Sequence, residues 1–374
     1  MFRILLLCVV SALSLGLPAA PQAQPADEGS APFYVEGAPA AVASPMRFTA
    51  GAVYQQYDDD DVDLAVLSVP FTTSFSLTRA LSLGVRASFV SADGADQASY
   101  FGYADTQAAL SFQQTFGGTS AVASLSVNLP TGVEGATPQE AETAFLIGQA
   151  FYGFRLPTLG QGYNVAPGLT IAFPVSSGLA VGVGASYQYR GPFEPSRLSD
   201  AEYDPGDEVL LSAGFDARLG AASTVALDAT YVVYSEDTFE GFAYTTGDAF
   251  MVTAQWTAGL GGHDVQLLGR ARVRGETSIP PETLALLGPD ATVPTQGRLL
   301  GHARFRFGDR LRFGVRAQGR YYEESEVFSA KTLFDVGVVP EVQVAPGLWL
   351  NGRVGGTVGD LQGFDVGAGL AWGL

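Results

Sequence analysis

The stretch QGRLLGHARFRF (Gln296–Phe307) and the stretch LRFGVRAQGRYY (Leu311–Tyr322) decide the fold class. In both of them arginine or another polar residue alternates with a small, aliphatic or aromatic residue. Successive side chains of a β-strand point to opposite faces, so this period of two predicts strands with one apolar and one basic face. Gly308-Asp309-Arg310 joins the two segments and predicts a tight turn. Such a sheet belongs either to a soluble sandwich or to a membrane barrel whose polar face lines a wet lumen.

The composition and the N-terminus indicate an exported protein. The chain has 374 residues with a single cysteine, Cys8. Met1–Ala23 has a positive residue, an apolar run over Ile4–Leu17 and a small-residue end, which is typical of a secretory signal peptide. No later run of about 18 apolar residues predicts a helical span, so only a closed barrel could cross a bilayer. The formal net charge of −18 argues against nucleic acid, itself a polyanion, as a partner.

Pairs of alternating segments recur along the chain and are joined in turn by tight turns and long loops. The predicted strands of about 10–14 residues can cross a hydrocarbon core when tilted. Short periplasmic turns and longer outer loops are typical of outer-membrane barrels. We therefore predict an all-β fold, an antiparallel up-and-down transmembrane barrel over residues 46–374 in the bacterial outer membrane, with about 16 strands and 14 as the alternative. Tyrosines near the long-loop ends predict an aromatic belt: Tyr54, Tyr57, Tyr187, Tyr189, Tyr231, Tyr234, Tyr321 and Tyr322.

Two segments depart from the strand pattern. Residues 24–45 are rich in alanine and proline and are predicted to be a flexible tail or a small plug in the pore. Thr137-Pro138-Gln139-Glu140 has the N-cap, N1 and N3 residues of a helix start, which predicts a helix in one extracellular loop over Pro138–Phe154. This helix either crosses the pore mouth as a gate or caps the rim without gating. The aromatic residues of the gate would be Phe145, Phe151 and Tyr152.

Three consecutive predicted strands carry a basic face and form the candidate site. The basic residues predicted to line the lumen are Arg270, Arg272, Arg274, Arg298, His302, Arg304, Arg306, Arg312, Arg316 and Arg320. Like charges this close repel, so counter-charges or anions should lie nearby. The predicted luminal acids are Asp216, Asp228, Asp335, Glu341 and Asp365. Either the arginines pair with these acids and fill the lumen, or they form a ladder that selects anionic solutes such as carboxylates.

The sequence has no pattern of an enzyme or of a cofactor site. It contains no nucleotide-binding loop, zinc-ligand spacing or serine elbow. A lipid-facing Ser–His pair is also missing, because His263 falls in a predicted periplasmic turn and His302 faces the predicted lumen. The acidic loop Asp58–Asp61 lacks the glycine and distal glutamate of an EF-hand and is expected to be solvated. We therefore expect no enzymatic activity, no cofactor and no metal.

The last predicted strand, Gly363–Leu374, resembles the terminal assembly signal of bacterial outer-membrane proteins. Its apolar residues alternate with glycine, alanine and aspartate up to the C-terminus. The resemblance implies recognition by the barrel assembly machinery. That signal usually ends in an aromatic residue, whereas this chain ends in Leu374, with Trp372 two residues earlier.

The segment LSVNLPTG (Leu125–Gly132), a strand that runs into Pro-Thr-Gly, resembles a motif of outer-membrane proteins linked to phenol and other aromatic degradation pathways. Asp105-Thr106-Gln107 and Tyr187–Pro192 are similar to that family in style. The family is grouped with barrels of the long-chain fatty acid transporter type. The resemblance implies passive uptake of small hydrophobic or aromatic molecules through a barrel embedded in outer-membrane lipid. The alternatives are a general anion-preferring porin and a structural or adhesive surface barrel.

Overall fold

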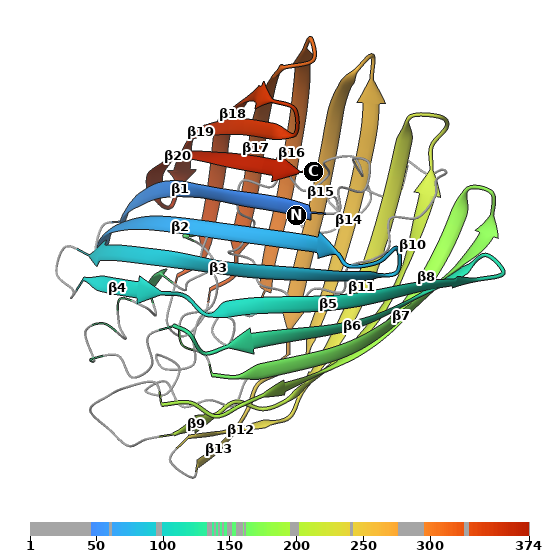
Figure 1. Cartoon of the computed structure of the whole chain (residues 1–374). Coiled ribbons are helices and arrows are strands. Elements are labelled where there is room, and N and C mark those ends of the chain that lie inside the picture. Colours follow the sequence, from blue (N-terminus) through green and yellow to red (C-terminus); the bar gives the residue numbers. More distant parts are fainter. Residues whose placement is uncertain are drawn as a thin grey trace.

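The described strands close into a sixteen-stranded antiparallel β-barrel (Figure 1). The computed structural model describes residues 46–59, 62–94, 99–132, 137, 140, 143, 146–147, 152–154, 160, 162–194, 202–239, 242–275, 295–324 and 329–373. The barrel strands are β1 (Met46–Asp59), β2 (Val62–Ser76), β3 (Leu81–Gly94), β5 (Thr106–Phe116), β6 (Thr119–Leu129), β7 (Asn164–Ser176), β8 (Leu179–Arg190), β10 (Glu208–Arg218), β11 (Ser223–Tyr234), β14 (Ala249–Leu260), β15 (His263–Arg274), β16 (Thr295–Phe307), β17 (Leu311–Tyr322), β18 (Lys331–Ala345), β19 (Leu348–Gly359) and β20 (Gln362–Gly373). The strand β4 (Tyr100–Tyr103) extends β5 along β3.

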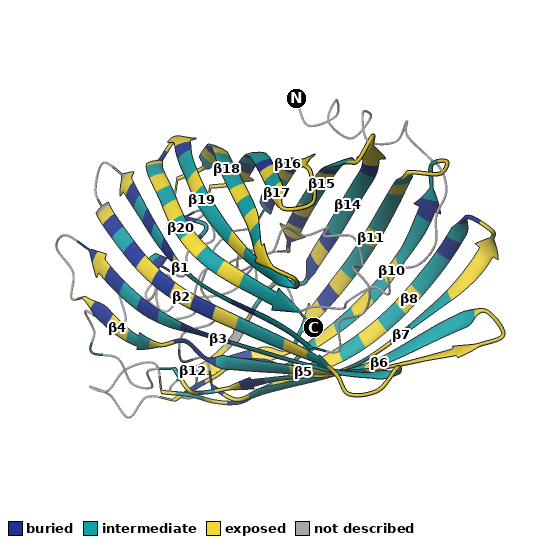
Figure 2. Ribbon diagram, turned by 45° about the horizontal axis from the view of Figure 1, so that its top comes forward, coloured by how far each residue is buried: buried dark blue, intermediate teal, exposed yellow. Residues whose placement is uncertain are grey.

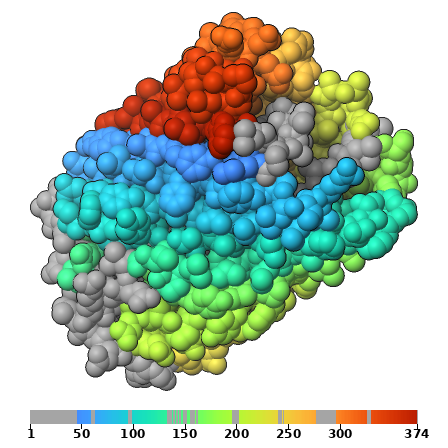
Figure 3. Space-filling view, viewed as in Figure 1, coloured from blue at the N-terminus to red at the C-terminus, as the bar shows by residue number. Residues whose placement is uncertain are grey.

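Pairing between the first and the last strand closes the barrel. The β1–β20 register runs from Arg47 opposite Gly373 to Asp58 opposite Gln362. Every hydrogen-bonding edge of the sheet is thereby satisfied within the wall, which is the condition for β-strands to cross lipid. Seen from outside, the side chains of β1 to β7 form a continuous surface (Figure 3). The predicted fold class and its sixteen strands are confirmed.

Exposure alternates along many of the strands (Figure 2), and large apolar side chains are exposed all around the barrel. On β2, Leu67, Val69 and Phe71 are 41%, 38% and 40% exposed, whereas the adjacent residues Val66 and Ser68 are each 1% exposed. A water-soluble sheet would bury these apolar side chains. An apolar exterior of this extent fits lipid, and the polar face then lines the lumen.

The turns at one end of the barrel are tight because glycine takes conformations that other residues rarely adopt. Gly117 and Gly118 have φ of 56° and 95°, and Gly261 and Gly262 have φ of 58° and 92°. Two-residue hairpins that match the twist of the sheet need positive φ, which glycine provides at no steric cost. The long connections gather at the opposite end of the barrel (Figure 1), as the sequence predicted.

The predicted tyrosine belt is correct in part. Tyr187 and Tyr231 point outward and are 44% and 42% exposed. The prediction was wrong for Tyr57, Tyr234 and Tyr322, which lie on the inner face of the wall. Adjacent residues of a strand point to opposite faces, so Tyr322 faces inward where Tyr321 faces outward. Tyr57 and Tyr322 are only 4% and 6% exposed.

Two connections predicted as long loops contain a second small sheet. It consists of β9 (Tyr203–Asp204), β12 (Glu236–Phe239) and β13 (Phe242–Thr245) and lies at the long-loop end (Figure 1). Asp237 is 2% exposed; one carboxylate oxygen accepts a hydrogen bond from the Gly206 amide and the other accepts one from the Thr246 hydroxyl at 2.7 Å. The loops that follow β8 and β11 are therefore joined by hydrogen bonds.

Three predictions concern residues that the structure does not describe. The signal peptide Met1–Ala23 and the segment 24–45, with its proposed plug residues, lie outside the described residues. So do Phe145 and Phe151 of the predicted gate. Within the described ranges, no helix is both long and apolar enough to span a membrane.

Candidate functional site

The arginines of β15, β16 and β17 lie in horizontal rows on the inner wall. Arg270 is opposite Arg298, and Arg298 is in turn opposite Arg320. Closer to the β16–β17 turn, His302 is opposite Arg316. Residues directly opposite in an antiparallel pair have Cβ atoms about 5 Å apart, so each row concentrates positive charge at one height. The wall thus holds closely spaced cations whose charge must be balanced.

Further toward the turns, Arg306 is opposite Arg312 and completes the wall. Arg272, Arg274 and Arg304 share the same inward faces and are 3%, 6% and 6% exposed. The guanidinium carbon of Arg274 lies 4.8 Å from the ring centre of Tyr234, which contributes a cation–π contact. The structure therefore places all ten predicted basic residues on one side of the lumen.

Acidic residues balance part of this charge. Arg320 pairs with Asp335 at 2.7 Å. Glu341 lies 3.7 Å from Arg304 and 3.8 Å from Arg312 and so serves both. Near the turns, Arg306 pairs with Asp264 at 2.6 Å. These pairs agree with the interpretation that luminal acids compensate the wall, although Asp264 was not among the predicted acids.

Two of the predicted acids have a different environment. Asp216 and Asp228 lie on β10 and β11, on another part of the wall, and make no ion pair among the described residues. Asp365 does pair, but with Arg353 of β19, which the sequence analysis did not single out. The signal was present, since Arg353 is an isolated charge within an alternating strand.

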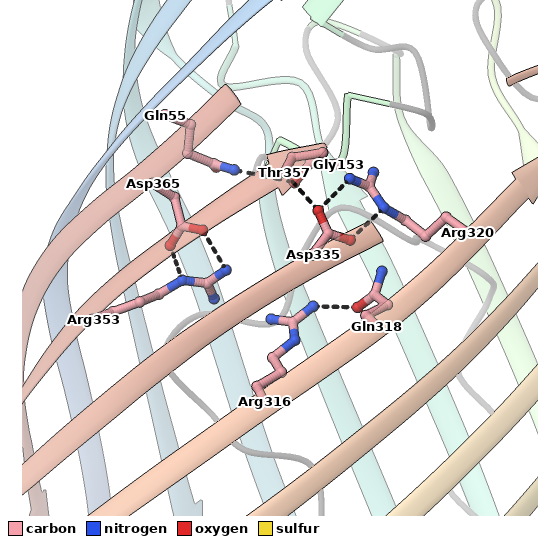
Figure 4. A network of polar contacts seen from close by, with 9 residues as sticks. All are labelled: Gln55, Gly153, Arg316, Gln318, Arg320, Asp335, Arg353, Thr357 and Asp365. Atoms are coloured by element: carbon pink, nitrogen blue, oxygen red, sulfur yellow. Dashed lines mark hydrogen bonds and ion pairs between the residues drawn. The ribbon is translucent and has the colours of Figure 1, made fainter. Parts of the chain in front are cut away.

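Arg298, Arg316 and His302 make no ion pair with a carboxylate in the described part of the chain, and neither does Arg274. The Nε atoms of Arg298 and Arg316 and Nε2 of His302 are buried and have no hydrogen-bond partner among the described atoms. Arg316 donates instead to the neutral side chain of Gln318 (Figure 4). An unsatisfied buried donor costs about 1–3 kcal/mol. These groups are therefore able to bind an anion that enters the lumen.

A second feature of the lumen is an apolar patch near the long-loop end. Its wall residues point inward and are almost completely buried: Leu64, Val66, Val90, Ala92 and Leu333. A polar lumen would not bury such side chains unless another segment covered them. The covering residues are Ile147, Tyr152 and Phe154 of the β6–β7 connection, which belong to the same hydrophobic cluster. This patch was not predicted, although consecutive apolar residues in Leu64–Leu67 break the alternation of the sequence there.

The β6–β7 connection begins its helical part as predicted. The Thr137 amide donates to the Glu140 carboxylate at 2.8 Å, and the Glu140 amide donates to the Thr137 hydroxyl at 3.3 Å. This reciprocal pair is a capping box. Glu140, Thr143, Leu146 and Ile147 are helical, which confirms the predicted helix at these positions. Tyr152, Gly153 and Phe154 are not helical, so the prediction of a helix up to Phe154 was wrong at its end; Gly153 has a φ of 65°, a conformation that terminates helices.

Tyr152–Phe154 of this connection lie against the inner wall. The Tyr57 ring centre is 5.7 Å from that of Tyr152 and 5.1 Å from that of Phe154, in the latter case edge to face. The Gln55 amide donates to the Gly153 carbonyl at 3.3 Å. Tyr152, one of the three predicted gate residues, is therefore packed on the inner wall; its role as a gate remains a prediction.

Polar contacts among three neighbouring strands, β17, β18 and β19, lie beside this contact (Figure 4). The Arg320 guanidinium donates to both oxygens of Asp335, at 2.8 and 2.7 Å, and the Thr357 hydroxyl donates to the same carboxylate at 2.6 Å. A Cβ atom on Gly153 would approach Arg320 Nη1 to 2.7 Å, and the φ of 65° at this position also favours glycine. Arg320, at the long-loop end of the arginine wall, thus lies in contact with Tyr152–Phe154, the tip of the loop.

The geometry defines the class of protein. A closed barrel with an apolar exterior, a charged lumen and a loop packed inside is a transmembrane β-barrel. No protein-family model matches the sequence, and no curated protein matches it either.

Solved structures with this architecture come from bacteria. OprB of Pseudomonas putida has 9% sequence identity and a TM-score of 0.46, over 88% of this chain and 93% of that chain. An outer membrane channel from Pseudomonas putida F1 has 10% identity and a TM-score of 0.42, over 94% and 99% of the two chains. OccD3 (OpdP) of Pseudomonas aeruginosa has 10% identity and a TM-score of 0.42, over 89% and 92%. Similarities at this level concern the fold and carry no information on the solute.

Proposed function

We propose that this protein is a channel of the bacterial outer membrane for the passive entry of small organic anions, aromatic carboxylates in particular. The observation that carries the proposal is the pair Arg298 and Arg316, inward-facing and without a carboxylate partner among the described residues. In this proposal the tight turns lie in the periplasm, and the barrel assembly machinery recognises β20.

A guanidinium suits this role because it binds a carboxylate through two parallel hydrogen bonds and keeps its charge at every physiological pH. Successive arginines let an anion pass from one site to the next. Conduction needs binding that is favourable enough for entry and weak enough for release. Closer to the tight turns, Glu341 lies 3.7 Å from Arg304 and 3.8 Å from Arg312. Its carboxylate competes with a passing anion for these two arginines and so weakens anion binding there.

An aromatic group finds apolar surface beside these cations. The Arg312 guanidinium carbon lies 3.8 Å from the ring centre of Trp349, on the inner wall near the turn end. Aromatic rings stack well on such guanidinium–indole arrangements. The resemblance of Leu125–Gly132 to barrels of aromatic degradation pathways supports the same class of solute. A general anion-preferring porin is the second candidate, because the unpaired arginines alone would favour it.

Blockade of ion current separates the candidates. We expect benzoate to interrupt the potassium chloride current of the purified protein in a planar bilayer, whereas benzyl alcohol, with the same ring and no charge, leaves the current unchanged. Equal effects of benzoate and acetate would support the general anion porin instead. A folded barrel that carries no current would support a structural or adhesive surface protein.

A further inference from the structure

The two ends of the β6–β7 connection meet at one buried carboxylate. Asp105, which precedes β5, is completely buried. One of its oxygens accepts a hydrogen bond from the Asn128 side-chain amide at 3.1 Å, and the other accepts one from the Gly132 amide at 3.0 Å. The Asn128 amide also donates to the Gly162 carbonyl at 2.9 Å. A single asparagine therefore joins the start of the connection to its end.

Close packing makes this arrangement specific. A Cβ atom on Gly132 would lie 2.7 Å from Asp105 Oδ1 and 2.8 Å from the Gly160 amide nitrogen. The Thr131 hydroxyl lies 2.8 Å from both the amide nitrogen and the hydroxyl of Thr106. Burying a carboxylate is costly unless hydrogen bonds satisfy it, and a satisfied buried network favours one geometry over all others. The strand end and the Pro-Thr-Gly segment thus have a defined structural task.

Between its two ends the connection contacts the inner wall at β1. Tyr152 and Phe154 are 2% and 3% exposed and pack on Tyr57, and Gln55 holds the Gly153 carbonyl. Gln55 is directly opposite Val66 in the β1–β2 pair. The segment inside the lumen is therefore fixed at two places, at its base by Asp105 and Asn128 and at its tip by the wall.

We propose that Asp105, Asn128, Thr131 and Gly132 form a clamp that keeps Tyr152–Phe154 against the inner wall, so that the clamp sets the width of the pore. These are positioning residues, because they act through Tyr152–Phe154 and touch no solute. The part of the proposal that concerns pore width rests on the proposed channel function. Release of the clamp lets the tip leave the wall, exposes the apolar patch and widens the lumen.

A cysteine at position 66 reports the release of the tip. In Val66→Cys, with Cys8 replaced by serine, the thiol is covered in the intact clamp and reacts slowly with a maleimide. Asn128→Leu removes both hydrogen bonds of the amide while nearly keeping its shape. We expect this variant to raise the labelling rate about tenfold, since opening becomes easier by the contribution of about one or two buried hydrogen bonds. It should also raise the size of the largest poly(ethylene glycol) that enters the pore.

Ser126→Ala is the matched control, because Ser126 faces the lumen two residues before Asn128 on the same strand and takes no part in the hydrogen bonds of the clamp. Thr131→Val, at an exposed position, provides a milder second variant if Asn128→Leu does not fold, and we expect about a threefold rise in its labelling rate. Labelling rates and exclusion limits equal to those of Ser126→Ala in the folded variants would overturn the proposal. Failure of the proposed function looks different: the parent channel would show no anion preference while the clamp variants still change the labelling rate.

Discussion

Replacing both Arg298 and Arg316 with glutamine lowers the anion-over-cation permeability ratio of the channel about tenfold, because a luminal charge contributes on the order of 1 kcal/mol to the energy of a passing ion. The effect is large at these positions because no carboxylate among the described residues neutralises either guanidinium. Arg304 and Arg306 have Glu341 and Asp264 as partners, so their replacement removes less uncompensated charge. The reversal potential of the variant in a salt gradient measures the ratio.

The control for this experiment changes the net charge by the same amount outside the lumen. Arg79 and Arg310 lie exposed in two of the tight turns, and their joint replacement with glutamine should leave the reversal potential close to that of the parent. An equal shift in both double variants would mean that overall charge, and not the arginine wall, determines selectivity. An unchanged potential in the Arg298 and Arg316 variant would refute the ladder directly.

Replacing Asp335 with asparagine lowers the free energy of unfolding of the barrel by about 3–5 kcal/mol, because it removes the carboxylate to which a buried guanidinium donates two hydrogen bonds. Arg320 is 5% exposed and donates to both oxygens of Asp335. Thr357 donates to the same carboxylate and loses a charged acceptor as well. Denaturant titration of the protein in lipid vesicles, followed by tryptophan fluorescence, measures the change.

Asp216→Asn is the matched control, since Asp216 is also a luminal aspartate but makes no ion pair among the described residues. We expect its unfolding free energy to stay close to that of the parent. Equal losses in the two variants would show that Arg320 and Asp335 contribute no more than any luminal charge. A stabilised Asp335→Asn protein would contradict the account of the network in Figure 4.

The barrel could be predicted from the sequence because its signals are local. The period of two in Gln296–Tyr322 reflects neighbouring side chains of one strand, and the turns at Gly117-Gly118 and Gly261-Gly262 are determined by glycine within two residues. The capping box of Thr137 and Glu140 is equally local. The inward position of the arginines follows from the same alternation.

The parts that could not be predicted depend on how distant strands meet. Which acid pairs with which arginine is set by strand register and side-chain reach, so Arg353 with Asp365 was missed while Asp216 was counted as a partner. The contact of Tyr152 with Tyr57 joins residues far apart in sequence and arises only when the barrel closes around the loop. Tyr57 was assigned to the outer belt because it lies near a strand end, where the aromatic residues of a membrane interface are expected.

The most direct test of the central claim is the reversal potential of the unmodified protein in a planar bilayer with a tenfold gradient of potassium chloride, a gradient in which complete selectivity gives about 59 mV per monovalent ion. The unpaired arginines of the lumen predict a steady current whose reversal potential has the sign for chloride. A potential near zero, or one with the sign for potassium, would contradict the claim that Arg298 and Arg316 determine what passes.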